Sequence, residues 1–453
     1  MPSGRVRPAE PLATLAPDSL AISLVLASHA CLLVRQGRSL TAGLAAALQS
    51  ADGRHAVAPA RAAAQDLAYF AMRQRARGDA LVARLCARPP VPEVLAELLM
   101  IALAVLDCTG DASAPHYAPH TLVDQSVMAA SRLATSGGAR VARGFVNAVL
   151  RRALRSREET FAAPVSDSVE ALNYPAWWIS SVAAAYPSCW REILSSGQSP
   201  PPLTLRVNLH KLSVDEAERM LQDAGIECIP LGGAALALVR PLPVNEITGF
   251  AEGLLSVQDE AAQRAGPLLD VKDGQHVLDA CAAPGGKTGH LLELADLELV
   301  ALDNDAQRLR RVAQNLLRLG VKATLTVGDA SDPSGWWDGR TFDRILADLP
   351  CSASGIVRRH PDIRWLRRET DVAALSRRQQ QMLDALWRLL SADGKLLLVT
   401  CSIFPQEGAL LAEEFTSRHP DARILPSPGQ LLPATAADVN HDGLFFSLVQ
   451  KAS

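Results

Sequence analysis

The chain has 453 residues, of which 48% are hydrophobic, 21% charged and 4% aromatic. This composition is typical of a soluble globular protein, and the length suits about three domains, so a fibrous or largely disordered chain is excluded. The formal net charge is −3, so a surface that binds nucleic acid must be a local cluster of basic residues.

The N-terminal stretch lacks the basic and then apolar order of a signal peptide, because Pro, Asp and Glu interrupt it. No apolar run approaches the roughly 18 to 20 residues that span a bilayer. We therefore expect a cytoplasmic protein with no membrane partner. The eight cysteines lie far apart without a CxxC pair, which predicts neither a metal site nor a disulfide framework.

The first part of the chain is predicted to be helical. Residues 1–20 are rich in Pro and Ala and are expected to form a loose extension. Residues 22–156 are rich in Ala and Leu at helical spacing, which predicts an all-helical domain. Its last element, "GGARVARGFVNAVLRRALRSREE", carries six arginines. Both a solvated helix face and a phosphate-binding surface fit this density.

Residues 165–265 mix short helices with strand-like runs, such as "LTLRVNL" and "GLLSVQDEAA". This pattern predicts a small α+β connector domain.

From residue 266 to residue 453, apolar strands alternate with amphipathic helices, which predicts a doubly wound parallel sheet. The strands are expected at 276–282, 297–303, 323–329, 342–350 and 395–402, with "LFFSLVQK" (444–451) closing the sheet. Helices are expected near 287–295, 305–319, 371–391 and 406–418. Ligands of such sheets bind outside the carboxyl ends of the strands, so the chemistry should lie there.

The first strand leads into the glycine turn "DACAAPGGKT", at residues 279–288. A nucleotide-phosphate loop of the Walker A type needs glycine where Cys281 stands, and the dinucleotide pattern GxGxxG is absent. The turn therefore suits close approach to a ligand without phosphates.

Acidic residues end the next two strands. Asp303 suits a bidentate hydrogen bond to ribose hydroxyls, although the same spacing also fits a helix N-cap. Asp329 suits the exocyclic amino group of an adenine. A nucleoside cofactor without phosphates, such as S-adenosylmethionine, fits these groups.

Two cysteines follow the last two predicted parallel strands, Cys351 in "DLPCS" and Cys401 in "TCS". Both are expected in one cleft, where a thiolate suits covalent addition to an electron-poor ring such as cytosine or uracil. Between them, residues 355–380 carry seven arginines and three acids. This segment favours a phosphate-backbone partner, with a solvated face as the alternative.

These motifs occur in the order and spacing of a known family. "DACAAPGGKT", "ALDND", "GDA", "DLPCSASGIVRRHPDIRW" and "VTCSIFPQE", preceded by "LRVN" and "SVQDEAAQ", resemble the RNA cytosine-5 methyltransferases of the Sun family. "FVNAVLRR" is similar to the end of a NusB-type domain. The resemblance implies an all-α NusB-like domain, an α+β connector and a C-terminal α/β Rossmann-like class I methyltransferase domain.

The resemblance also implies the site residues and the cofactor, S-adenosylmethionine. Asp303 would bind the ribose, Asp329 would lie at the adenine, and Asp348 would lie between the methyl donor and the target base. The segment that would wrap the methionine part comprises Cys281, Ala282, Ala283, Pro284, Gly285, Gly286 and Lys287.

In this family the nucleophile is the cysteine of the TCS motif, so Cys401 would attack C6 of cytosine and Cys351 would assist release. Asp348 would stabilise protonation at N3. Leu349 stands where alanine is usual, and GDA replaces GDG.

We expect a monomer that acts on 16S ribosomal RNA, with transfer RNA or another ribosomal cytosine as the alternative target. A non-catalytic RNA-binding assembly factor is the other alternative. The residues expected to contact RNA are Arg358, Arg359, His360, Arg151 and Arg152.

Overall fold

The protein is represented by a computed structural model that describes residues 15–16, 18–50, 58–111, 114–134, 137–436 and 439–452. They form two compact units. One comprises Met1–Ser181, Gly197–Pro200 and Val357–Arg367, and the other comprises Val182–Ser196, Pro201–Ile356 and Arg368–Ser453. The loose extension expected at residues 1–20 lies outside the described residues as far as residue 14.

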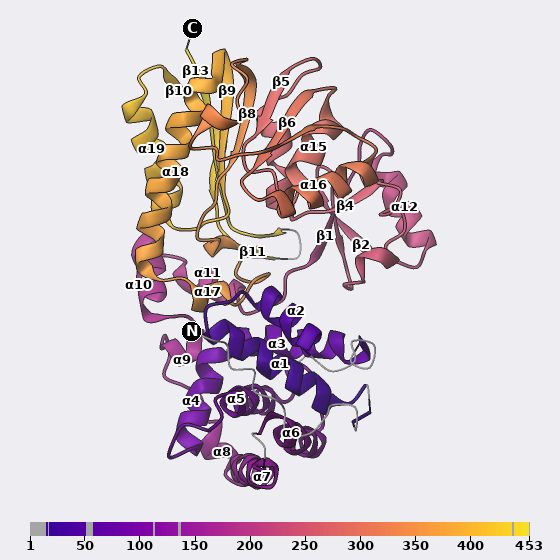
Figure 1. Cartoon of the computed structure of the whole chain (residues 1–453), viewed down its shortest axis with the longest axis vertical. Coiled ribbons are helices and arrows are strands. Elements are labelled where there is room, and N and C mark those ends of the chain that lie inside the picture. The colour runs from indigo at the N-terminus through magenta and orange to yellow at the C-terminus, as the bar shows by residue number, and fades with distance from the viewer. Residues whose placement is uncertain are drawn as a thin grey trace. The chain divides into compact units, whose positions relative to one another are not determined.

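Among its described residues the first unit contains helices and no strand, as the apolar spacing predicts (Figure 1). Its α-helices are α1 (Leu20–Arg35), α2 (Leu40–Ser50), α3 (Arg61–Arg73), α4 (Arg75–Leu85), α5 (Val94–Asp107), α6 (Pro119–Leu133), α7 (Ala139–Arg155), α8 (Arg157–Thr160), α9 (Val169–Leu172) and α17 (Ile363–Leu366). Helix α10 (Ala176–Ala185) crosses the boundary between the units. Helix α5 contacts α1, α3, α4, α6 and α7. Apart from Glu97 and the terminal Asp107, its sequence is apolar on every side, so it is buried in the middle of this unit.

Residues 357–367 belong to the first unit, although the sequence-based boundary at residue 266 assigns them to the C-terminal domain. The buried Arg364 guanidinium donates to the carbonyls of Asn173 (3.1 Å) and Gly197 (2.7 Å). It also lies 4.0 Å from the centre of the Tyr174 ring. The Asp362 carboxylate accepts the Leu40 N–H at 2.8 Å. These long-range bonds explain why the segment packs with the helices.

The second unit contains α11 (Trp190–Ser196) and, after it in the chain, a four-stranded antiparallel sheet in the order β2-β3-β1-β4. Its strands are β1 (Leu203–Val207), β2 (Cys228–Gly232), β3 (Ala235–Leu238) and β4 (Leu255–Val257), with α12 (Val214–Asp223) between β1 and β2. A capping box between Ser213 and Glu216 begins α12. This is the mixed α and β composition expected for the connector.

The larger sheet has seven strands in the order β10-β13-β9-β8-β5-β6-β7. Strands β5 (His276–Asp279), β6 (Glu298–Asp303), β7 (Thr324–Val327), β8 (Phe342–Asp348) and β9 (Leu390–Thr400) are parallel. Strand β13 (Leu444–Lys451) pairs antiparallel with β9, and β10 (Ala422–Leu431) pairs antiparallel with β13. The doubly wound sheet and the closing strand are confirmed, whereas β10 was not expected.

Helices cover both faces of this sheet (Figure 1). Residues of α18 (Glu369–Leu389) and α19 (Ala409–Arg418) join one apolar core with the sheet. Residues of α15 (Gly286–Leu294) and α16 (Ala306–Leu319) join the core on the other face. Because helices cover both faces of the sheet, a ligand is expected to bind at the carboxyl ends of the parallel strands.

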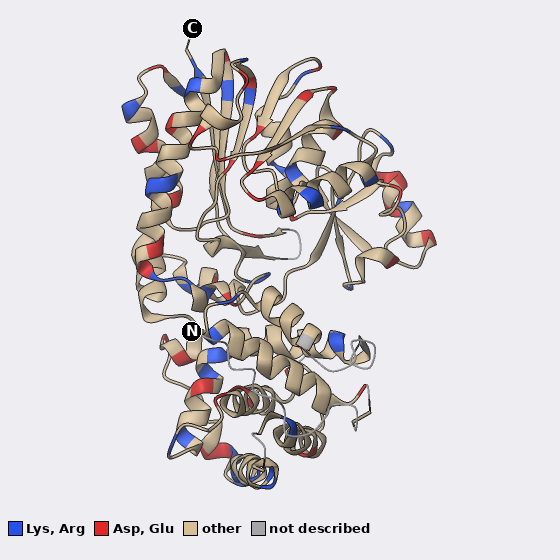
Figure 2. Cartoon of the chain, viewed as in Figure 1, with Lys and Arg blue, Asp and Glu red and all other residues tan. Residues whose placement is uncertain are grey.

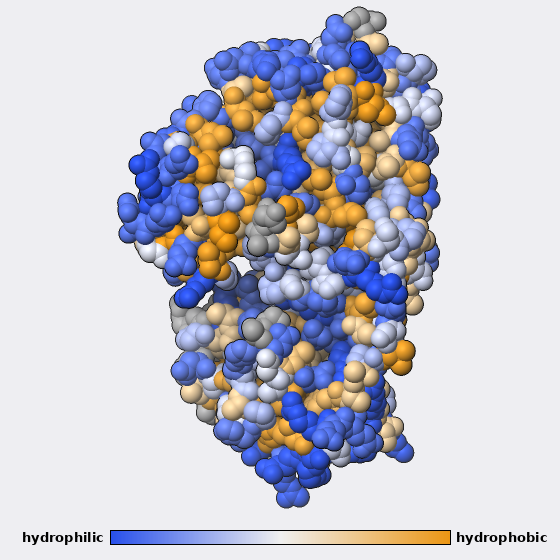
Figure 3. Space-filling model, turned by 180° about the vertical axis from the view of Figure 1, so that it is seen from behind, coloured by the Kyte–Doolittle hydropathy of each residue, from blue (hydrophilic) through white to orange (hydrophobic). Residues whose placement is uncertain are grey.

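No helix in the described ranges is both long and apolar enough to cross a membrane. On the face drawn in Figure 3, hydrophobic residues are interspersed with hydrophilic ones.

Candidate active site

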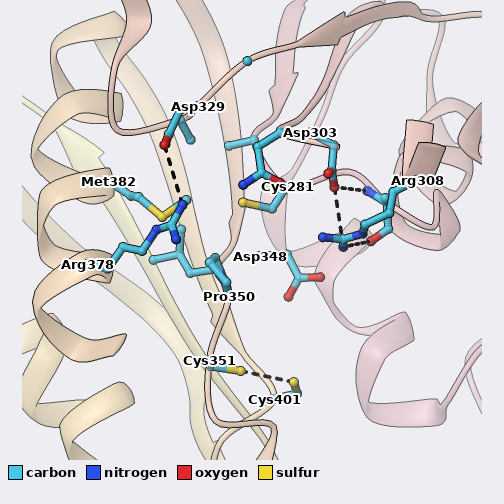
Figure 4. Close-up of a pocket in the computed structure, with 16 residues that line it drawn as sticks. Cys281, Asp303, Arg308, Asp329, Asp348, Pro350, Cys351, Arg378, Met382 and Cys401 are labelled. Atoms are coloured by element: carbon cyan, nitrogen blue, oxygen red, sulfur yellow. Dashed lines mark hydrogen bonds and ion pairs between the residues drawn. The ribbon is translucent and has the colours of Figure 1, made fainter. Parts of the chain in front are cut away.

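A cavity of about 240 Å³ lies at the carboxyl ends of the parallel strands, within the second unit (Figure 4). Its lining comes from the segments that follow β5, β6, β7, β8 and β9 and from α18. The lining residues are Ala280, Cys281, Ala283, Asp303, Asn304, Arg308, Gly328, Asp329, Ala330, Asp348, Leu349, Pro350, Cys351, Arg378, Met382 and Cys401. The strand-end groups singled out in the sequence therefore meet in one place.

The turn between β5 and α15 supplies one wall of the cavity. Gly285 has a φ of +99°, and a Cβ there would lie 3.1 Å from the Cα of Val312. Only glycine fits this left-handed position so close to α16. Within the predicted cofactor segment, Cys281 and Ala283 line the cavity. Burial raises the pKa of the Cys281 thiol, with a further rise from Asp348, so Cys281 stays a neutral thiol.

Asp303, at the end of β6, is buried at the edge of the cavity. Its Oδ2 accepts the Ala283 N–H at 3.2 Å, and its Oδ1 accepts the Asp305 N–H at 3.0 Å. The N-cap of α16 is Asp305, which accepts the Gln307 N–H at 2.7 Å. The alternative role of Asp303 as N-cap is therefore wrong.

Asp329 follows β7 at the far end of the cavity from the cysteines (Figure 4). The N–H and the hydroxyl of Ser331 donate to its Oδ1 at 2.9 and 2.7 Å. These two hydrogen bonds lower the pKa of Asp329, the backbone N–H contributing most. Its Oδ2 also lies 3.6 Å from Arg378. Asp329 therefore presents a carboxylate that can accept further hydrogen bonds.

Asp348 ends β8 and lies between the two ends of the cavity (Figure 4). Its Oδ2 is 2.6 Å from the Lys287 ammonium. Burial alone lowers the pKa of Lys287, but the charge and hydrogen bond of Asp348 outweigh burial, and the net shift is upward. Lys287 is therefore a cation, and it fixes the direction of the Asp348 carboxyl.

The two cysteines face each other, with 3.2 Å between the Sγ atoms of Cys351 and Cys401 (Figure 4). Cys351 is buried and Cys401 is half-buried. The hydrogen bond to Cys401 raises the pKa of Cys351 well above its usual value, and burial raises it further. Cys351 is therefore a thiol that keeps its proton, and either sulfur can be the donor in the contact between the two cysteines.

Two residues around the site were not predicted to have a role. Glu407 is fully buried and accepts hydrogen bonds from Ser352 and Ser402, which directly follow the two cysteines. Arg206 of β1 is fully buried and donates to Glu293 and to the carbonyl of Gly286, at the start of α15. The sequence alone does not show which partners a single acidic or basic residue has. The only signal available was position, because Arg206 lies in the motif "LRVN" and Glu407 ends the motif "VTCSIFPQE".

The five residues expected to contact RNA do not line the cavity. Arg151 and Arg152 are exposed on α7, which carries five arginines and no acid (Figure 2). His360 is exposed and Arg359 is half-buried, whereas Arg358 is 2% exposed. Arg358 is therefore a buried residue of the first unit and is not proposed as an RNA contact.

Comparisons with known proteins identify the family that this chain resembles. Residues 267–442 match the family described as 16S rRNA methyltransferase RsmB/F, and residues 174–245 match the ferredoxin-like domain of RsmF/B-like methyltransferases. The chain is 39% identical to "Ribosomal RNA small subunit methyltransferase B" of Vibrio cholerae over 92% of this chain and 95% of that one.

Solved structures share the fold. The crystal structure of PH0851 covers 95% of this chain and 99% of its own, with a TM-score of 0.74 and 24% identity. A methyltransferase homolog protein from Pyrococcus horikoshii covers 62% of this chain and 97% of its own, with a TM-score of 0.54 and 26% identity.

Proposed function

Because the chain belongs to the RsmB/F family of 16S ribosomal RNA methyltransferases, we propose that it methylates C5 of one cytosine in 16S ribosomal RNA. The observation that carries this proposal is the pair of thiols 3.2 Å apart in the cavity that Asp348 also lines. One thiol accounts for covalent attack on the base, and the second accounts for release of the product.

The residues of the cavity fit S-adenosylmethionine, which supplies an electrophilic methyl group when bound. The turn before α15 lacks a phosphate-binding pattern, and the carboxylates of Asp303 and Asp329 suit hydroxyl and amino donors. Asp348 is a third acid in the cavity lining, and it lies between Asp329 and the two cysteines (Figure 4). Three acids suit a cationic sulfonium better than they suit an anionic ligand.

Cys401 is assigned the attack on C6 of the cytosine. A thiolate is the reactive form of cysteine, and a thiol that keeps its proton is a poor nucleophile. Since the pKa of Cys351 is raised, Cys351 is suited to donate a hydrogen bond to the Cys401 sulfur. Addition at C6 makes C5 electron-rich, so that C5 attacks the methyl group.

Cys351 is assigned to assist the later step, in which a base takes the C5 proton, the electron pair of that C–H bond re-forms the C5–C6 double bond, and Cys401 leaves C6 as a thiolate. The 3.2 Å separation allows both sulfurs to reach one ring. Asp348 is assigned to the N3 and N4 edge, where it favours the addition by stabilising a proton at N3. Lys287 holds the Asp348 carboxyl at 2.6 Å and so limits its rotation.

The RNA is proposed to contact basic residues of the first unit. Arg151 and Arg152 on α7 are suited to phosphates, because this helix has no acid to neutralise them. Arg359 and His360 follow the Cys351 loop in the chain and are proposed as further contacts. The target cytosine must leave its stack to reach the cavity.

Bisulfite sequencing of ribosomal RNA from cells with and without the protein tests the substrate. One methylcytosine lost from 16S RNA supports the proposal, and loss from transfer RNA or another ribosomal RNA would move the assignment there. Purified Cys401→Ala should bind S-adenosylmethionine as tightly as wild type and transfer no methyl group, whereas Cys351→Ala should accumulate a covalent protein–RNA adduct. Full transfer by Cys401→Ala would contradict the mechanism.

A further inference from the structure

Both cysteines lie beyond the ends of their strands. Strand β8 ends at Asp348, three residues before Cys351, and β9 ends at Thr400, one residue before Cys401. The ladder between β8 and β9 therefore does not hold the cysteines themselves. Their 3.2 Å separation depends on contacts made by the two loops.

The Glu407 carboxylate joins these loops. Its Oε1 accepts the Ser352 N–H at 2.8 Å and the Gln379 amide at 3.2 Å. Its Oε2 accepts the hydroxyls of Ser352 and Ser402 at 2.5 and 2.7 Å. Four donors thus fill the four acceptor positions of one carboxylate. Ser352 and Ser402 each directly follow a cysteine, so one side chain fixes the residue after each thiol.

Further bonds close this network. The Ser354 hydroxyl lies 2.9 Å from the Ser402 hydroxyl and accepts the Ile403 N–H at 2.9 Å. The Gly355 N–H donates to the Cys401 carbonyl at 2.9 Å. Gln379 of α18 also donates to the carbonyl of Pro350, at 3.0 Å. A shift of one cysteine loop therefore shifts the other.

We propose that Glu407 is a positioning residue that sets the separation of the Cys351 and Cys401 thiols. It does not line the cavity, so in the proposed mechanism it contacts neither the base nor the methyl donor. This inference rests on the proposed function, in which both thiols act on one ring. A carboxylate suits the position because it accepts from every neighbour, and charge-assisted bonds are about twice as strong as neutral ones.

Glu407→Gln keeps the size of the side chain but replaces one acceptor oxygen by a donor. Because all four hydrogen-bonding groups around the carboxylate donate, at least one bond must be lost or reversed. We expect kcat for methyl transfer to fall about 10-fold in Glu407→Gln and about 100-fold in Glu407→Ala, since misplacing reacting groups by about 1 Å costs about that much. The KM for S-adenosylmethionine should change less than about twofold, because the donor's binding groups are untouched.

A second measurement reports the thiol geometry without catalysis. Diamide takes two electrons and two protons from the thiols, forms a Cys351–Cys401 disulfide and is itself reduced to the hydrazine. Because disulfides need a specific approach of the sulfurs, the crosslink should form rapidly in the wild-type protein and about fivefold or more slowly in Glu407→Gln. Mass spectrometry of the linked peptides follows the reaction.

Glu97→Gln is the matched control. Glu97 is also fully buried and ion-paired, with Arg35 and Arg75, but it lies in the first unit. It should lose thermal stability while kcat and the crosslinking rate stay within about twofold of wild type. If Glu407→Ala fails to fold, Ser402→Ala removes a single donor and should still slow both kcat and crosslinking.

Unchanged kcat and crosslinking in Glu407→Gln and Ser402→Ala would overturn the inference, and so would a wild-type protein that forms no crosslink. Equal losses in Glu407→Gln and Glu97→Gln would also overturn it, because they would indicate stability alone. Failure of the proposed function is separate: methyl transfer by Cys401→Ala would refute that mechanism, whatever the crosslinking rates.

Discussion

Replacing Arg206 by Met should destabilise the second unit and weaken cofactor binding. The guanidinium is fully buried and donates to both oxygens of the buried Glu293, at 3.0 and 2.7 Å, and to Gln258. Its fourth bond, at 2.9 Å, is to the carbonyl of Gly286 in the turn that lines the proposed cofactor site. The substitution leaves the Glu293 carboxylate buried without its cation.

Removing one partner of a buried ion pair costs about 3 to 5 kcal/mol. For a unit of this size, each kcal/mol lowers Tm by about 2 to 4 °C, so a fall of about 6 to 20 °C is expected. The Kd for S-adenosylmethionine should rise, because the turn at Gly286 loses a donor that fixes its carbonyl. Thermal unfolding of the full chain and calorimetric titration with the cofactor measure both effects.

The double variant Arg206→Met with Glu293→Leu is the control, because it removes both charges. It should recover at least half of the lost Tm, since an apolar replacement of a buried pair is often neutral. If Arg206→Met melted within about 2 °C of wild type, or if the double variant melted lower still, the reasoning from an uncompensated buried carboxylate would be refuted.

Two further predictions concern charge. Burial raises the pKa of Asp279 to about 7, so the folded state binds more protons than the unfolded state between about pH 4 and 7, and stability should fall as pH rises through that window. Asp279→Asn should flatten this part of a melting-temperature profile against pH, and an unchanged slope would refute the assignment. Replacing Arg151 and Arg152 by Glu should weaken RNA binding. It should also make the slope of log affinity against log salt concentration shallower, by the equivalent of up to about two phosphate contacts. Arg219→Glu on α12 is the control on an exposed arginine of the other unit, and equal loss in both variants would refute a specific role for α7.

The strand ends could be predicted because parallel strands have a strong apolar signature and their carboxyl ends share one edge. Strand β10 could not be predicted, because its sequence "ARILPSPGQL" contains two prolines and a glycine, which are typical of a loop. The structure places it at the edge of the sheet, where a strand tolerates proline because one side has no partner.

The arginines of residues 355–380 show a second limit. Counting charges predicts a basic surface, but Arg358 and Arg364 are buried. The Arg364 guanidinium bonds to backbone carbonyls of residues 173 and 197, far away in the chain. Sequence patterns along the chain do not reveal such partners. The same holds for Glu407, whose bond to Ser352 joins residues 55 positions apart.

Residues 357–367 belong to the first, helical unit although they come late in the chain. This arrangement affects how the chain folds during synthesis. The helices from α1 to α9 leave the ribosome long before residue 357 is made, and domains usually fold as they emerge. Until that segment appears, the Leu40 N–H and the carbonyls of Asn173 and Gly197 lack their native partners. The N-terminal unit therefore completes its packing only after about four fifths of the protein has been translated. A fragment that stops before this segment would lack a structural part of its own core.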